Sequence, residues 1–185
     1  MECMATNMGE TPVLQTGRLN LVMLSRDDLA LGMLSLSDLS QQLGLPLVPD
    51  LFKGAVRGAI EKKLVKMEAI GTQETPWFTY WLIVVRDEGV GAGMVGFKGV
   101  PNSLGEVEIG YGIDPLFQNM GYMTEAVKAM VAWAFKNPAC KVVTAILSKP
   151  DNFASHRVLE KSGFIKFYGG PDGLSFRIER QPAQD

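Results

Sequence analysis

Hydrophobic and polar positions alternate in short runs along this chain and recur every three to four positions in longer ones. This pattern predicts strands and helices in mixed order. Strands are expected at 19–23, Thr79–Val85, Met94–Val100, Glu106–Ile113, Lys141–Leu147, Phe164–Tyr168 and Leu174–Arg180. Helices are expected at 25–36, at 50–71, after Asp114-Pro115 and at Asn152–Ser162, whereas Gly44, Pro46 and Pro49 interrupt residues 37–49.

The predicted order of elements is β-α-α-β-β-β-α-β-α-β-β. The three strands between residues 79 and 113 form an antiparallel meander. The helix between Glu106–Ile113 and Lys141–Leu147 acts as a β-α-β crossover, which joins parallel strands. The sequence therefore predicts an α/β fold of the mixed α+β kind, in which helices flank a mixed sheet.

The helix expected to begin at Asp50 and to end at Gly71 has two distinct faces. Its apolar stripe contains Phe52, Val56, Ile60, Leu64 and Met67. Its basic face contains Lys53, Arg57, Lys62, Lys63 and Lys66. We interpret the basic face as solvated; the alternative is an anion-binding face.

Length and composition exclude several classes of protein. The 185 residues favour one domain, expected at residues 13–180 behind a flexible leader at 1–12. A net charge of −2 is not the footprint of a nucleic-acid-binding protein. The apolar runs are far shorter than the ~20 residues of a membrane helix, and the N-terminus lacks a secretory signal pattern. We therefore expect a cytoplasmic protein with no nucleic-acid or membrane partner.

Cysteine and histidine are too few for two further classes of site. The chain contains Cys3, Cys140 and one histidine, His156. This count excludes a disulfide framework and a Cys/His zinc site, and we expect no metal. His156 stands beside Arg157 in a short predicted helix and is expected at the surface.

Two glycine-rich segments could contact phosphate groups. Gly91–Gly96 matches G-x-G-x-x-G, but the residues that follow predict a strand where a dinucleotide site needs a helix. We therefore interpret it as a β-turn that leads into a strand, and not as the site of a generic nucleotide-binding protein. The segment 118–126, in contrast, follows a strand and runs into a helix. Gly121 and the helix N-terminus could hold phosphate oxygens through backbone N–H groups; the alternative is an ordinary helix start.

Several ordered blocks of residues together resemble one family. The blocks are Thr16-x-Arg18-Leu19-x-Leu21, Gly110-Tyr111, Gln118-x-x-Gly121-x-Met123, Glu125-Ala126, Asn152-x-x-Ser155 and Glu160-Lys161-x-Gly163-Phe164. They resemble the GNAT acetyltransferase superfamily over residues 14–180. The opening block and the Asn-x-x-Ser form resemble its ribosomal-protein N-terminal acetyltransferase-like branch.

The resemblance implies a mostly antiparallel sheet with splayed central parallel strands, here Glu106–Ile113 and Lys141–Leu147, and acetyl-CoA as co-substrate between them. The implied function is direct acetyl transfer to a primary amine of a small molecule or a protein N-terminus, by a monomer or homodimer. The implied cofactor-binding residues are Tyr111, Gly112, Ile113, Gln118, Asn119, Met120, Gly121, Tyr122, Met123, Thr124 and Asn152. The alternative function is a non-catalytic acyl-CoA-binding or sensor domain.

The resemblance also suggests catalytic residues. Glu108 matches the family's frequent general base, and Glu106 lies on the same face of the strand; the alternative is that Glu108 is a structural carboxylate. Backbone N–H groups at 111–113 would stabilise the developing oxyanion. Leu159 stands where many members have a tyrosine that protonates the thiolate, so we assign this role to Ser155.

Other positions are more ambiguous. Met123 replaces the family's glycine or alanine and could crowd the phosphate loop. Tyr111 is expected to be a core residue in addition to its cofactor contact. Trp77, Tyr80 and Trp81 could frame the acceptor pocket, although core packing explains at least two of them.

Overall fold

The computed structural model describes residues 12–181, so the predicted leader lies outside the described residues apart from Pro12. Within that range the chain forms an eight-stranded sheet in the order β1-β2-β3-β4-β5-β6-β8-β7. The strands are β1 (Val13–Gln15), β2 (Leu19–Met23), β3 (Trp81–Val85), β4 (Val90–Phe97), β5 (Glu106–Ile113), β6 (Val142–Ser148), β7 (Ile165–Gly170) and β8 (Gly173–Glu179). Neighbouring strands are antiparallel except for β5 and β6.

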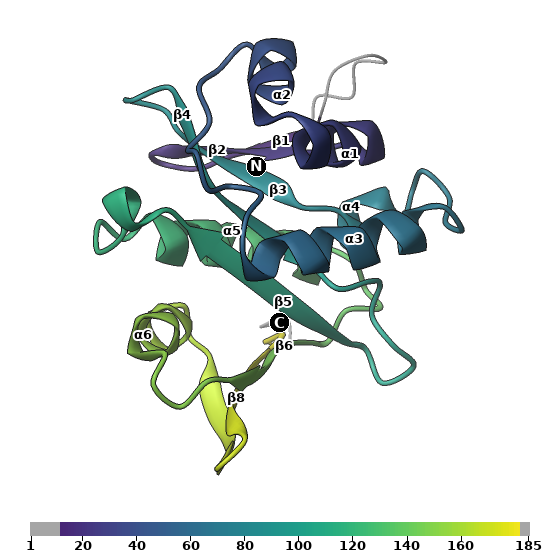
Figure 1. Cartoon of the computed structure of the whole chain (residues 1–185). Coiled ribbons are helices and arrows are strands. Elements are labelled where there is room, and N and C mark those ends of the chain that lie inside the picture. Colours follow the sequence, from purple (N-terminus) through teal and green to yellow (C-terminus); the bar gives the residue numbers. More distant parts are fainter. Residues whose placement is uncertain (1–11, 182–185) are drawn as a thin grey trace.

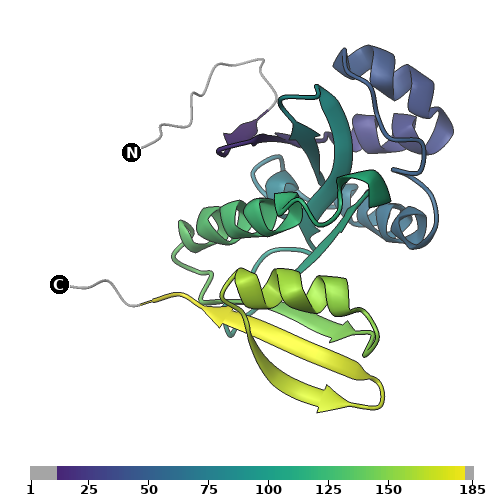
Figure 2. The same cartoon turned by 90° about the vertical axis from the view of Figure 1, so that its left-hand side faces the viewer.

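Helices cover both faces of the sheet. They are α1 (Arg26–Leu34), α2 (Leu36–Leu43), α3 (Ala55–Met67), α4 (Thr75–Phe78), the 3-10 helix η1 (Pro115–Phe117), α5 (Tyr122–Phe135) and α6 (Phe153–Lys161). In Figure 1, α3 crosses in front of β5 and α5 lies behind it. Figure 2 shows α6 beside α5, with which it is in contact.

The parallel pair at the centre separates after three residues of each strand. Glu106, Val107 and Glu108 of β5 pair with residues 142–144 of β6. Beyond this point β5 pairs only with β4, while β6 continues along β8. Figure 1 shows β6 and β8 diverging from β5 toward α6. The predicted mixed sheet with splayed parallel strands is therefore confirmed.

Glycines leave one face of the free half of β5 uncovered. Gly110 and Gly112 share the face that also carries Glu106 and Glu108. A Cβ atom added to either glycine would meet no heavy atom within 4 Å. On the neighbouring strand, a Cβ atom at Gly93 would lie 2.4 Å from the Gly112 carbonyl oxygen, so β4 approaches β5 closely there.

Some predicted boundaries were wrong for local reasons. Residues 37–49 were expected to be irregular, but most of their first half belongs to α2, which Ser35 caps and Gly44 ends. The next helix begins at Ala55 instead of Asp50, because Gly54, with φ of 63°, interrupts the chain there; the Asp50 carboxylate pairs with Lys53 and caps no helix. It also ends at Met67, before Gly71.

Two further segments, α4 and β1, were not predicted, since they contain only four and three residues. The segment Gly91–Gly96 lies within β4, and, as expected, no helix follows it directly. The turn expected there was wrong, because the strand already begins at Val90. No helix within residues 12–181 has the length and apolarity needed to cross a bilayer.

Two residues expected at the surface are buried. His156 is 7% exposed, and its ring packs 5.4 Å from that of Phe176. Lys63, expected on the solvated face of α3, is 6% exposed and faces the sheet. Helix α3 starts five residues later than predicted. Its buried face contains Ile60, Lys63 and Met67, and so differs from the predicted apolar stripe by the inclusion of Lys63.

The Lys63 ammonium compensates for its burial through backbone oxygens. Nζ donates to the carbonyl oxygens of Phe78 at 3.0 Å and Thr79 at 3.2 Å, and also to that of Phe97. It lies 4.5 Å from the centre of the Tyr80 ring. Desolvation, together with the positive charges of the nearby Lys66 and Lys98, lowers the pKa of Lys63 to about 7. Lys63 therefore joins α3 to the adjoining ends of β3 and β4.

Lys63→Met should lower the free energy of unfolding by about 1–3 kcal/mol, because three carbonyl oxygens lose a donor. Between pH 7 and 10.5 the unfolded chain keeps a proton on Lys63 that the folded chain releases, so folding is favoured as pH rises. The stability difference between wild type and variant should therefore grow over this range in urea unfolding. The exposed neighbour Lys62→Met is the control and should show neither effect. A difference that shrinks with pH would mean that folding raises the pKa of Lys63.

Candidate active site

A cavity of about 490 Å³ opens where β5 and β6 separate. The end of β5, the loop before α5, the first turn of α5 and helix α6 form its walls. The lining residues are Tyr111, Gly112, Ile113, Phe117, Gln118, Asn119, Gly121, Tyr122, Met123, Thr124, Asn152, Ala154, Ser155, Arg157, Val158 and Lys161. Every residue predicted to bind the cofactor is among them except Met120.

The loop before α5 turns through two left-handed residues. Asn119 has φ of 63°, and Gly121, the N-cap of α5, has φ of 80°. Because the N-cap is a glycine, no side chain caps the helix, and its first-turn N–H groups are available to an acceptor. Met123 packs in the hydrophobic core at 6% exposure while also reaching the cavity wall. It therefore does not fill the loop from the solvent side.

Two hydroxyl groups meet on the opposite wall. Asn152 caps α6 by accepting from the Ser155 amide at 3.2 Å, which fixes the first turn of this helix. Ser155 Oγ lies 2.9 Å from Tyr111 Oη, and this hydrogen bond spans the separation between β5 and α6. Burial raises the pKa of Tyr111 to about 12, although the bond to Ser155 lowers it. Leu159 is fully buried, one turn farther along α6.

A second cavity, of about 430 Å³, lies between α3 and the sheet. Its lining residues are Val48, Asp50, Leu51, Lys53, Ala55, Val56, Ala59, Tyr80, Ala92, Gly93, Met94, Tyr111, Gly112, Ile113, Asp114 and Pro115. Residues 111–113 thus line both cavities. Of the three aromatic residues expected to frame an acceptor pocket, only Tyr80 lines this cavity. Trp77 and Trp81 instead pack against Trp133 in the core, at ring distances of 4.6 and 5.7 Å.

Residues 18–165 match the family model of the acetyltransferase (GNAT) domain. The chain belongs to the GNAT acetyltransferase family. It is 35% identical over 91 residues to a Bacillus subtilis protein named Uncharacterized N-acetyltransferase YjdG. That match covers 49% of this chain and 54% of the relative, so the chain spans about half the length of this curated relative.

Solved structures share the fold of this GNAT protein. The ribosomal-protein-S5-alanine acetyltransferase from Vibrio fischeri has a TM-score of 0.62 and 17% identity, over 94% of this chain and 99% of that one. An acetyltransferase from Agrobacterium tumefaciens has a TM-score of 0.60 and 21% identity, over 92% and 96% of the two chains. A mostly antiparallel sheet with splayed strands is therefore the fold of this GNAT family member.

The predicted catalytic residues occupy two different places in this GNAT chain. Ser155 lies at the first cavity, whereas Glu106 and Glu108 line neither cavity. Glu108 is half-buried and forms an ion pair with Lys98, the residue that follows β4. It lies on the strand face of Gly110 and Gly112, which leads to the second cavity at Gly112.

Sequence reasoning missed two cationic residues of the first cavity. Arg157 and Lys161 are four residues apart on α6, so both project toward the same wall. The predicted helix start at Asn152 already placed these two residues on one helix face, so the sequence contained the information needed to identify them. In the described chain, no three His, Cys, Asp or Glu side chains gather closely enough to hold a metal ion.

Proposed function

We propose that this GNAT protein is an acetyl-CoA-dependent N-acetyltransferase that transfers the acetyl group directly to a primary amine. The observation that carries the proposal is that residues 111–113 line both cavities. A co-substrate in the first cavity and an acceptor in the second would therefore meet at the free half of β5. Neither Cys3 nor Cys140 is needed as a nucleophile, and burial raises the pKa of Cys140 to about 11.

The residues of the first cavity suit acetyl-CoA, which supplies an activated acetyl group and a thiol leaving group. The uncapped N-terminus of α5 presents N–H groups and a partial positive charge to the pyrophosphate. Arg157 and Lys161 add positive charge to the wall of α6. Backbone N–H groups of residues 111–113 that β6 does not engage could stabilise the developing oxyanion.

The Ser155–Tyr111 pair supports the role of Ser155 as proton donor to the departing thiolate. The raised pKa of Tyr111 keeps its hydroxyl protonated at neutral pH. Ser155 Oγ lies 2.9 Å from Tyr111 Oη, which also donates to the Ser155 carbonyl oxygen at 3.2 Å, so Tyr111 positions Ser155 to give its proton to the thiolate. Leu159 has no proton to give, so this hydroxyl pair takes over the task.

Glu108 is our proposed general base. Four residues along a strand span about 13 Å, so a proton from an amine near Gly112 would reach Glu108 through water. The exposed glycine face between them leaves room for that water. The ion pair with Lys98 holds the Glu108 side chain in position.

The acceptor proposed here is an amine attached to an apolar group, such as the N-terminal residue of a protein. Val48, Leu51, Val56 and Met94 give the second cavity apolar walls. Asp114 is a carboxylate of the same cavity and could attract an ammonium group, whereas the Asp50 carboxylate is already paired with Lys53. The S5-alanine acetyltransferase named above, whose acceptor carries an apolar side chain, supports this choice.

The decisive experiment combines calorimetric titration of acetyl-CoA with thiol release over a panel of amines. We expect micromolar binding, and turnover of alanyl- and leucyl-peptides at least tenfold faster than of spermidine. Binding without turnover on any amine would instead favour a non-catalytic acyl-CoA sensor. A chain that does not bind acetyl-CoA would refute both functions.

Glu108→Gln should lower kcat by about 10²–10⁴-fold at pH 7, because the amide cannot accept the proton. The deficit should shrink as pH approaches the pKa of the acceptor amine, since a neutral amine needs no base. Glu106→Gln, two residues away on the same face, is the matched control and should lose less than threefold. If the control is the inactive variant, the roles of the two carboxylates are reversed; if both variants are fully active, this mechanism is wrong.

Ser155→Ala should lower kcat by about 10²-fold, a typical loss for a proton donor, and leave the Kd for acetyl-CoA within threefold. Tyr111→Phe should lower kcat less, because Ser155 keeps its own proton. Tyr168→Phe, at an exposed position on β7, is the control and should retain wild-type kcat. Wild-type kcat in Ser155→Ala would leave Ser155 with only a structural role.

A further inference from the structure

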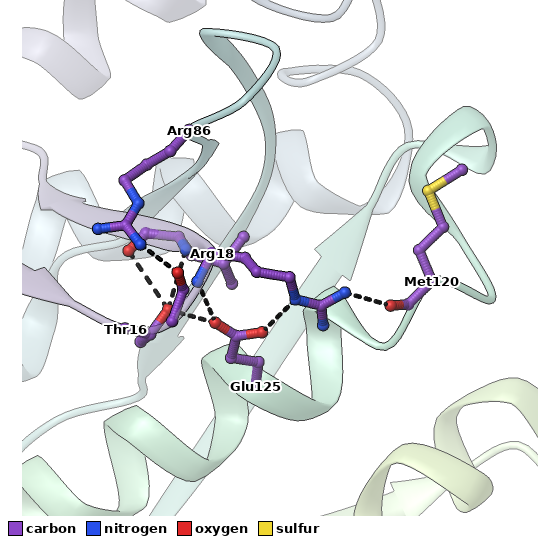
Figure 3. A network of polar contacts seen from close by, with 7 residues as sticks. Thr16, Arg18, Arg86, Met120 and Glu125 are labelled. Atoms are coloured by element: carbon purple, nitrogen blue, oxygen red, sulfur yellow. Dashed lines mark hydrogen bonds and ion pairs between the residues drawn. The ribbon is translucent and has the colours of Figure 1, made fainter.

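The turn between β1 and β2 contacts the first turn of α5, more than one hundred residues later in the chain (Figure 3). Glu125 is the centre of this contact. Its Oε1 atom accepts from Thr16 Oγ1 at 2.6 Å and from the Arg18 amide at 2.7 Å. Its Oε2 atom accepts from Arg18 Nε at 2.8 Å. Both carboxylate oxygens are therefore held by the turn.

The same guanidinium group also contacts the loop before α5. Arg18 Nη1 donates to the Met120 carbonyl oxygen at 2.9 Å, and the guanidinium lies 4.6 Å from the centre of the Tyr122 ring. A Cβ atom at Gly121 would lie 3.3 Å from Arg18 Nη2. Arg18 thus touches the residues on both sides of Gly121, although it does not line the cofactor cavity.

This loop needs an external support to keep one conformation. Asn119 and Gly121 both adopt left-handed backbone angles, and the glycine N-cap offers no side-chain hydrogen bond. Glycine also has the largest conformational freedom to lose. Arg18 supplies what the loop lacks, because its planar group fixes the Met120 carbonyl and the α5 carboxylate at the same time.

Charge adds a second requirement. Glu125 lies in the first turn of α5, beside the N–H groups proposed to bind pyrophosphate. Partial burial alone would raise its pKa, but the hydrogen bonds from Thr16 and Arg18 hold the pKa below its usual value. The carboxylate therefore remains ionised and would repel a phosphate group unless a cation balances it. The Arg18 guanidinium is that cation.

We propose that Arg18 is a positioning residue of the cofactor site, which fixes the phosphate loop and neutralises Glu125 from outside the cavity. The inference rests on the proposed binding of acetyl-CoA. It makes the turn at residues 16–18 part of the cofactor site, although this turn contributes no lining residue. The alternative is that the contact between Arg18 and Glu125 only stabilises the packing of β2 against α5.

The test compares binding and kinetics of wild type, Arg18→Met and Arg86→Met. Arg86 donates to the Gly17 carbonyl oxygen, so its removal also loosens the turn but leaves the loop contacts intact. We expect Arg18→Met to weaken acetyl-CoA binding and to raise its KM at least tenfold, with kcat within threefold. Arg86→Met should keep both constants within threefold. Arg18→Lys should recover only part of the loss, because one amine cannot replace both guanidinium contacts.

Two further measurements separate positioning from stability. S-acetylpantetheine lacks the pyrophosphate, so Arg18→Met and wild type should use it equally well as acetyl donor. Adding Glu125→Gln to Arg18→Met should restore at least threefold of the lost acetyl-CoA affinity, because the unpaired carboxylate is gone.

The possible failures are distinct. A wild-type protein that does not bind acetyl-CoA would refute the proposed function. If wild type binds but Arg18→Met binds equally well, the positioning role alone is refuted. Equal losses in Arg18→Met and Arg86→Met, or an equal loss with S-acetylpantetheine, would assign the contact to stability.

Discussion

The separation of β5 from β6 after Glu108 is the constraint on which the rest of this structure depends. Three residues of parallel pairing hold the two parts of the sheet together, and the remainder of β5 has a hydrogen-bonding partner on one side only. An unpaired strand edge buried in a protein would leave polar backbone groups unsatisfied. Here that edge opens into a cavity, where a bound molecule can engage those groups.

Several elements around the point where β5 and β6 stop pairing help to keep the first cavity open. The glycines on β5 remove side chains that would fill the exposed face. The hydrogen bond between Tyr111 and Ser155 bridges the two sides at a fixed distance. Helix α5 packs its buried positions against the sheet, while its uncapped N-terminus faces the opening. Strands β1–β5 and the part of the chain that contains α6 and β6–β8 therefore enclose one cavity, although β5 and β6 pair over only three residues.

Local sequence signals predicted β5 and the last two helices closely, whereas β4 begins four residues earlier than expected. Glu106–Ile113 is the strand expected, and Asn152 caps α6 as expected. The errors lie where tertiary contacts override local chemistry. Lys63, for example, is buried because backbone carbonyl oxygens of other elements accept hydrogen bonds from its ammonium group. Hydrophobic periodicity predicts that every lysine of a helix is exposed to solvent. It does not show where carbonyl groups of other elements will accept hydrogen bonds from a buried lysine.

The residues of the candidate site, like the elements of the fold, could be predicted from the sequence only in part. The ordered blocks identified the cavity lining, because a glycine before a helix has a recognisable pattern. Arg18 belonged to one of those blocks, yet its contact with Met120 depends on how β2 and α5 pack. The ion pair of Glu108 with Lys98 likewise depends on strand register, which an isolated sequence does not specify.

The strand order also constrains how this molecule assembles during synthesis. β8 lies between β6 and β7, although it follows both along the chain. Neither β6 nor β7 has its long antiparallel neighbour until residues 173–179 have left the ribosome. Helix α6, which forms one wall of the first cavity, lies between these two strands in the chain. Pairing between distant segments is slow to form. Strands β6 and β7, which flank α6 along the chain, therefore gain their shared neighbour last, when β8 is inserted between them.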